Sequence, residues 1–147
     1  MKFEKFAEDL FRWLKPQLRR HQGLKIFAQE RAKFEGWLKA EFCEFLEKRG
    51  YDPEPEKLCH DRKRRIDMTC RGWAVELKTL NTPYDYPGAK SKKKPLSKNV
   101  SSLQEDIDKL KTDKVAKKFK NRAVLFIVFP LEASNGRWQN TYLPRIE

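Results

Sequence analysis

The sequence predicts an α/β fold in which a small mixed β-sheet is flanked by helices. Three observations support this fold class. Several long segments carry apolar residues at helical spacing. Two short segments on either side of Arg71-Gly72 alternate apolar and polar residues, which is the pattern of a β-hairpin. Residues 123–129, AVLFIVF, form a continuous apolar run that is typical of a central strand covered on both faces.

Two helices are expected in the N-terminal part of the chain. The first lies in residues 3–20 and is expected to end near Pro16, because proline removes a backbone donor. The second runs over residues 26–49 and stops at Gly50. Its apolar stripe is formed by Phe34, Leu38, Phe42 and Phe45. Residues 1–25 are interpreted as an N-terminal helical extension.

A short first strand is expected around residues 57–60, and the hairpin follows it. A two-residue turn at Arg71-Gly72 would place Asp67 directly opposite Glu76. A bulged three-residue turn is the alternative, because a two-residue turn requires Arg71 at positive φ. With the two-residue turn, alternation puts one set of side chains on one face and a second set on the other. The first set is Asp67, Glu76 and Lys78, and the second is Trp73, Val75 and Leu77.

The C-terminal half is expected to return to helix and strand after a basic loop. Residues 82–99 are rich in Pro and Lys and predict a mobile loop. A helix is expected over residues 100–120, opened by Ser101 or Ser102. After the apolar strand, a last short strand is expected at residues 141–146.

Length and composition restrict the class of protein. The chain has 147 residues, of which 39% are hydrophobic, so we expect one globular domain over residues 1–147. The net charge of +12 favours a polyanionic partner, most often nucleic acid. No apolar run approaches the length of a membrane span, so no membrane partner is expected. The three widely spaced cysteines predict reduced thiols in a cytoplasmic protein.

The two hairpin acids require an explanation. Like charges directly opposite each other on neighbouring strands are destabilising. One explanation is a solvated sheet face on which Arg65 and Lys78 balance Asp67 and Glu76. The other is a divalent cation between the carboxylates, because hard cations bind one or two carboxylates together with water and substrate phosphates.

Asp67 and Glu76-Leu77-Lys78 resemble the D…(D/E)xK signature of the PD-(D/E)XK nucleases, the restriction-endonuclease-like superfamily. Two acid-x-Lys triplets occur in the chain, at residues 61–63 and 76–78, and only the second lies in an apolar alternating strand. The order of helix, strand, hairpin, helix and buried strand over residues 30–130 is similar to the core of that family. One departure is Ile66, which stands where the signature has proline.

The resemblance implies a catalytic role for each matching residue. Asp67 and Glu76 would bind Mg²⁺, or Mn²⁺ as an alternative, with the backbone carbonyl of Leu77 as a third ligand. Lys78 would orient or deprotonate the attacking water and stabilise the phosphate. A helix glutamate would assist the metal through water. Glu35 is the first choice for it and Glu41 the second, with Glu44 and Glu30 left open.

The resemblance also implies DNA as the substrate, with RNA less expected. The expected contacts with nucleic acid are Arg62, Lys63, Arg64, Arg65, Lys92, Lys93, Lys94 and Gln104. A homodimer is left open, with the N-terminal helix as its candidate interface.

Three classes of function therefore compete. The first is a Mg²⁺-dependent DNA nuclease, expected to be an endonuclease in repair, restriction, or the processing of junctions or mobile elements. The second is a nucleic-acid-binding module with a nuclease-like fold and no cleavage of its own. The third is a basic structural protein that binds no metal and leaves the two acids to Arg65 and Lys78.

Overall fold

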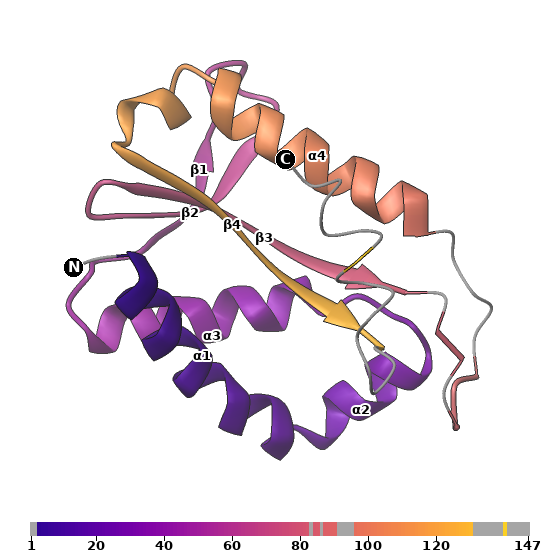
Figure 1. The fold of residues 1–147 in the computed structure, drawn as a ribbon. Helices are drawn as coiled ribbons and strands as arrows, with labels where there is room; N and C mark the ends of the chain where they lie inside the picture. The colour runs from indigo at the N-terminus through magenta and orange to yellow at the C-terminus, as the bar shows by residue number, and fades with distance from the viewer. Residues whose placement is uncertain (1–2, 83, 86, 91–95, 131–139, 141–147) are drawn as a thin grey trace.

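The computed structural model describes residues 3–82, 84–85, 87–90, 96–130 and 140. The elements in chain order are α1 (Phe3–Arg20), α2 (Gln22–Gln29), α3 (Glu35–Lys48), β1 (Glu54–Leu58), β2 (Arg65–Cys70), β3 (Trp73–Asn81), α4 (Leu96–Thr112), the 3-10 turn η1 (Ala116–Lys118) and β4 (Asn121–Phe129). The strands form one sheet in the order β1-β2-β3-β4, with α4 on one face and α1 and α3 on the other (Figure 1). The predicted class, a small mixed sheet flanked by helices, is confirmed.

The hairpin has the predicted register. Cys70 pairs with Trp73, and the antiparallel ladder continues to Met68 and Val75. Arg71 has a φ of 25° and Gly72 a φ of 84°, so both turn residues adopt the left-handed conformation of a two-residue turn. β4 then pairs with β3 in parallel, which makes the sheet mixed.

Each face of the sheet has its own apolar core. The core under α1 and α3 contains Leu10, Leu14, Leu38, Phe42, Phe45, Met68, Val75 and Leu77, with Trp73 packed against it. The cores under α4 and η1 contain Ile66, Ala74, Leu80, Leu103, Leu110 and Ala116. Trp73, Val75 and Leu77 therefore share one face, as alternation predicted. The three cysteines are free thiols, two of them buried.

In the described part of the chain, β2 and β3 are the inner strands of the sheet and β4 is not. The apolar run at residues 123–129 predicted a central position, and this prediction is wrong for the described part of the chain, where β4 is the last strand of the sheet. Its side chains from residue 123 to residue 128 are half-buried. A continuous apolar run requires cover on both faces of a strand, and the helices provide that cover in part. The run carries no information on whether both backbone edges are paired.

Several predicted boundaries are corrected. α1 continues past Pro16 to Arg20, because one lost backbone hydrogen bond does not end an otherwise favourable helix. β1 begins at Glu54 and includes Pro55, which an edge strand tolerates. α4 begins at Leu96, before the predicted serine caps, and ends at Thr112. The basic loop is correspondingly shorter. Lys92, Lys93, Lys94 and the expected strand at 141–146 lie outside the described residues.

The predicted second helix is split into α2 and α3 by a buried arginine. Arg31 has a φ of 51°, which interrupts the helix, and its side chain is only 1% exposed. Its guanidinium donates to the carbonyl oxygens of Thr82, at 2.7 Å, and Tyr84, at 2.8 Å. Arg31 thus holds the segment after β3 against the start of α3. None of the described helices is both long and apolar enough to span a membrane.

Replacing Arg31 with methionine should destabilise the fold. The carbonyl groups of Thr82 and Tyr84 would lose their donors, and we expect the free energy of unfolding to fall by about 2 kcal/mol. Urea unfolding measures this change. Arg12→Met, at an exposed position of α1, is the control and should change stability by less than about 0.5 kcal/mol. Equal effects of the two substitutions would contradict the role given to Arg31.

Candidate active site

The site lies where β2 and β3 separate. Their ladder pairs extend from Cys70–Trp73 to Met68–Val75, and Asp67 is the next residue on β2. The Asp67 Oδ2 atom accepts a hydrogen bond of 2.8 Å from the Leu77 amide, so the side chain satisfies a donor that the diverging strand leaves unpaired. The carboxyl groups of Asp67 and Glu76 are near enough that each shifts the pKa of the other. The structure therefore brings the two acids near each other, and their role as metal ligands stays a prediction.

Glu76 is the most deeply buried acid of the site, with 2% of its surface exposed. Its Oε2 atom lies 2.7 Å from the Lys109 ammonium. Burial raises the pKa of Glu76 to about 8, the Asp67 charge adds to this rise, and Lys109 opposes it. Its Oε1 atom is buried and has no hydrogen-bond partner in the described part of the chain.

The pKa of Asp67 shifts in the opposite direction to that of Glu76. Burial by itself would raise the pKa of Asp67, but the Leu77 amide and the Lys39 ammonium outweigh burial and lower it. Lys39 Nζ lies 2.9 Å from Asp67 Oδ1 and also contacts Glu56. Asp67 is therefore the acid of the pair that ionises more readily, and Glu76 is the one that is protonated more readily.

Lys78 follows Glu76 on the same face of β3. Its ammonium lies 2.7 Å from Asp106 Oδ2 on α4, and both side chains are largely shielded from water. Burial would lower the pKa of Lys78, but Asp106, with smaller contributions from Glu35 and Asp67, raises it. Lys78 is therefore held as a cation.

Glu35 is the helix glutamate nearest to this strand. It is the first residue of α3, and its Oε1 atom accepts a hydrogen bond of 3.1 Å from the Thr79 amide. The other three candidates have different partners. Glu41 lies 3.6 Å from His21, Glu44 lies 2.6 Å from Lys48, and Glu30 lies 3.6 Å from Lys90. The geometry favours Glu35, and its metal role stays a prediction.

Sequence reasoning missed three charged residues of the site: Lys39, Asp106 and Lys109. One of the two explanations for the acids was a solvated sheet face on which Arg65 and Lys78 balance their charge. Instead Arg65 donates to the Glu56 carbonyl oxygen and Lys78 pairs with Asp106.

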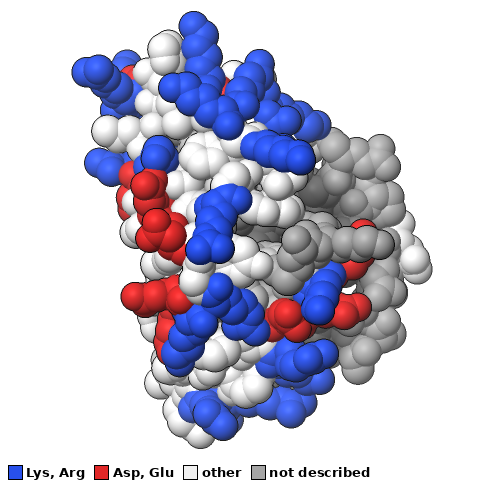
Figure 2. Space-filling view, turned by 90° about the vertical axis from the view of Figure 1, so that its left-hand side faces the viewer, with Lys and Arg blue, Asp and Glu red and all other residues white. Residues whose placement is uncertain are grey.

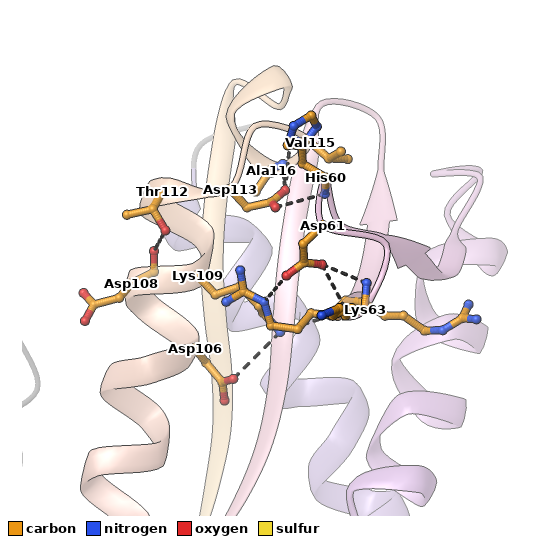
Figure 3. Close-up of polar contacts among 12 residues, drawn as sticks. His60, Asp61, Lys63, Asp106, Asp108, Lys109, Thr112, Asp113, Val115 and Ala116 are labelled. Carbon is orange, nitrogen blue, oxygen red and sulfur yellow. Dashed lines mark hydrogen bonds and ion pairs between the residues drawn. The ribbon is translucent and has the colours of Figure 1, made fainter.

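One signal for the two α4 residues was present in the sequence. Asp106 and Lys109 lie between Leu103 and Leu110 on the side of α4 that packs against the sheet, where charges are unexpected (Figure 3). Gln104 instead donates to Asp108, at 3.4 Å, and does not contact Lys78 in the described structure. Its role in nucleic-acid binding stays a prediction.

Of the predicted basic residues, Arg62, Lys63 and Arg64 lie in an exposed turn, and the exposed Arg65 begins β2. Asp61 accepts hydrogen bonds from the amides of Lys63 and Arg64, and Asp113 accepts one from His60 (Figure 3). Because Asp113 follows the C-terminal end of α4, this contact ties the turn to the helix that carries Lys109. On the face that Figure 2 shows, Lys and Arg predominate over Asp and Glu.

The residues present fit a hard divalent ion of the kind that keeps several waters. Two carboxyl groups lie near enough to shift each other's pKa, and the buried Glu76 Oε1 atom has no hydrogen-bond partner among the described residues. Among the described residues there is no group of three or more His, Cys, Asp or Glu side chains that could hold a metal. Mg²⁺ requires only one or two carboxylates when water and phosphate complete its coordination. The Leu77 carbonyl stays a predicted ligand.

Comparison of the chain with protein-family models, with curated proteins and with solved structures finds no match. The resemblance to the nuclease signature is therefore carried by Asp67, Glu76 and Lys78 and by the geometry around them.

Glu76 should make the protein less stable as the pH rises. Its pKa is about 8 in the folded chain and 4.5 as an ordinary glutamate, so the folded state binds more protons between these values. The free energy of unfolding should therefore fall as the pH increases from about 5 to about 8. Urea unfolding in metal-free buffer measures this slope.

Glu76→Gln should remove most of the fall, whereas Glu44→Gln, at an exposed position, should retain it. Identical slopes for the wild type and Glu76→Gln would show that Glu76 titrates normally.

Proposed function

We propose that the protein is a metal-dependent nuclease that hydrolyses phosphodiester bonds of DNA, acting as an endonuclease. The observation that supports this proposal is the proximity of the Asp67 and Glu76 carboxyl groups, each of which shifts the pKa of the other. Lys78 lies two residues further on in β3, where its ammonium pairs with Asp106. Two neighbouring acids and a nearby cation match the needs of a metal-bound, negatively charged phosphate.

Asp67 and Glu76 would hold Mg²⁺, or Mn²⁺, together with the Leu77 carbonyl oxygen, and Glu35 would assist through water. The bound ion polarises a phosphoryl oxygen and lowers the pKa of the water that attacks. Glu76 must lose its proton to become a ligand, so metal affinity should increase as the pH rises toward 8.

Lys78 fits the role of charge stabilisation better than that of a base. Asp106 and the neighbouring acids raise its pKa, which keeps the ammonium protonated. A protonated amine cannot remove a proton from water, but it offsets the negative charge that develops on the phosphate in the transition state. Lys78 is therefore assigned to the scissile phosphate.

DNA is the proposed substrate because the chain carries a net charge of +12 and an exposed basic turn precedes β2. Repair, restriction and the processing of junctions or mobile elements are all compatible roles. A second candidate function is a nucleic-acid-binding module without cleavage. The retention of Asp67, Glu76 and Lys78 in contact with charged partners favours the nuclease over this module.

Removal of any one of the three signature residues should abolish cutting. Asp67→Asn, Glu76→Gln and Lys78→Met keep side-chain size while removing charge, and we expect cleavage rates to fall at least about 100-fold. The assay uses supercoiled, linear, single-stranded and branched DNA with Mg²⁺ or Mn²⁺. Glu105→Gln, an exposed acid on α4, is the matched control and should cut normally.

Two outcomes would contradict the nuclease. A folded wild type that binds DNA but does not cut it would favour the binding module. Cutting that survives all three substitutions would place the chemistry elsewhere.

The basic turn should contribute to DNA binding through phosphate contacts. In the double variant Arg62→Ala, Lys63→Ala, the slope of log affinity against log salt should decrease by about two. Fluorescence anisotropy of a labelled duplex across a salt titration measures it. The control is Arg20→Ala, Lys25→Ala, which removes the same charge from exposed positions of α1 and α2. Equal salt slopes for the two double variants would show that the turn makes no more phosphate contacts than other exposed basic residues.

A further inference from the structure

Lys109 lies among oxygen atoms that come from three different elements. Its Nζ atom is 2.7 Å from Glu76 Oε2 on β3, 3.0 Å from the Arg65 carbonyl oxygen on β2 and 3.8 Å from Asp106 Oδ1 on its own helix. The side chain is only 11% exposed. A buried ammonium needs such partners, because it has lost most of its water. These three oxygen atoms therefore form a cation-binding site, and the Lys109 ammonium occupies it.

A divalent metal at the proposed active site would use the same carboxylate. Lys109 pairs with Glu76 Oε2, and the Oε1 atom of the same group has no hydrogen-bond partner among the described residues. An ion bound there would lie beside the Lys109 ammonium, where both side chains are largely shielded from water and like charges repel more strongly than in bulk solvent. Full occupancy by both cations is therefore unfavourable.

Asp106 offers Lys109 a second partner. Its Oδ1 atom is 3.8 Å from Lys109 Nζ, while its Oδ2 atom binds Lys78 at 2.7 Å. A small movement of the Lys109 side chain toward Asp106 would take positive charge away from Glu76 and keep the ammonium paired. Asp106 would then serve two ammonium groups, so its hold on Lys78 would weaken.

We propose that Lys109 is a tethered cation that competes with the divalent metal for Glu76 and moves onto Asp106 when the metal binds. This inference rests on the proposed function, because it concerns the same site. It gives α4 a regulatory role. Lys109 sets the metal concentration at which the site becomes occupied. Asp106 couples metal binding to Lys78, because its weakened pairing with Lys78 frees that ammonium to move toward the phosphate.

Titration of Mn²⁺ alone into the purified full chain, without nucleic acid, tests the competition by calorimetry. Lys109→Met removes the charge and keeps an unbranched side chain, and we expect Mn²⁺ to bind at least about tenfold more tightly than to the wild type. Lys111→Met, at an exposed position of the same helix, is the matched control and should leave the affinity unchanged. Equal or weaker binding by Lys109→Met would overturn the proposal.

Asp106→Asn provides an independent test that remains informative if Lys109→Met does not fold. It removes the second partner, so Mn²⁺ should bind at least about tenfold more weakly. Asp108→Asn, which removes the same charge from an exposed position, should have little effect. Where both single variants fold, adding Asp106→Asn to Lys109→Met should change the affinity far less than it does in the wild type, because Asp106 acts through Lys109. Unchanged or tighter Mn²⁺ binding by Asp106→Asn would overturn the proposed movement of Lys109 onto Asp106.

Failure of the competition is distinguishable from failure of the metal site. Wild-type binding that is abolished by Asp67→Asn, Glu76→Gln, but unaffected by Lys109→Met, would leave the metal site intact and make Lys109 a structural counter-ion only. Absence of Mn²⁺ binding in both the wild type and Lys109→Met would overturn the metal site and the competition together. Binding by Lys109→Met alone would support both.

Discussion

The burial of Glu76 beside Asp67 is the constraint on which the rest of the site depends. Two neighbouring carboxyl groups that have lost their water repel each other, and such a pair persists only where other groups compensate. The Leu77 amide and Lys39 stabilise the charge on Asp67, and Lys109 partly stabilises Glu76. The result is a pair in which Asp67 ionises more readily than Glu76, held at the point where β2 and β3 separate.

The lysines that pair with the two acids come from helices on opposite faces of the sheet (Figure 1). Lys39 comes from α3, which is fixed by its buried apolar side chains, and Lys109 comes from α4, which is fixed by Leu103 and Leu110. The packing of each helix therefore positions a charge as well as filling a core. Displacement of either helix would leave a buried carboxyl group without its ammonium partner, which is more costly than the loss of a surface ion pair.

Buried ion pairs are a poor source of stability, because apolar residues of equal volume are often as favourable. A cluster of acids and lysines in the centre of a small sheet is therefore better explained by chemistry than by folding. The nuclease proposal gives each member a task. Asp67 and Glu76 hold the ion and Lys78 faces the phosphate, while Asp106 and Lys109 control the charge of those groups before the ion arrives.

The sequence by itself determined the hairpin and its register from Cys70–Trp73 to Met68–Val75, because a two-residue turn and the alternation beside it involve only neighbouring residues. It also indicated helices on both faces of the sheet. Only the tertiary structure decided the edge position of β4, the break at Arg31 and the choice of Lys39 and Lys109 as partners of the acids. These features depend on how helices distant in sequence pack onto the strands, and no short stretch of the chain encodes that packing.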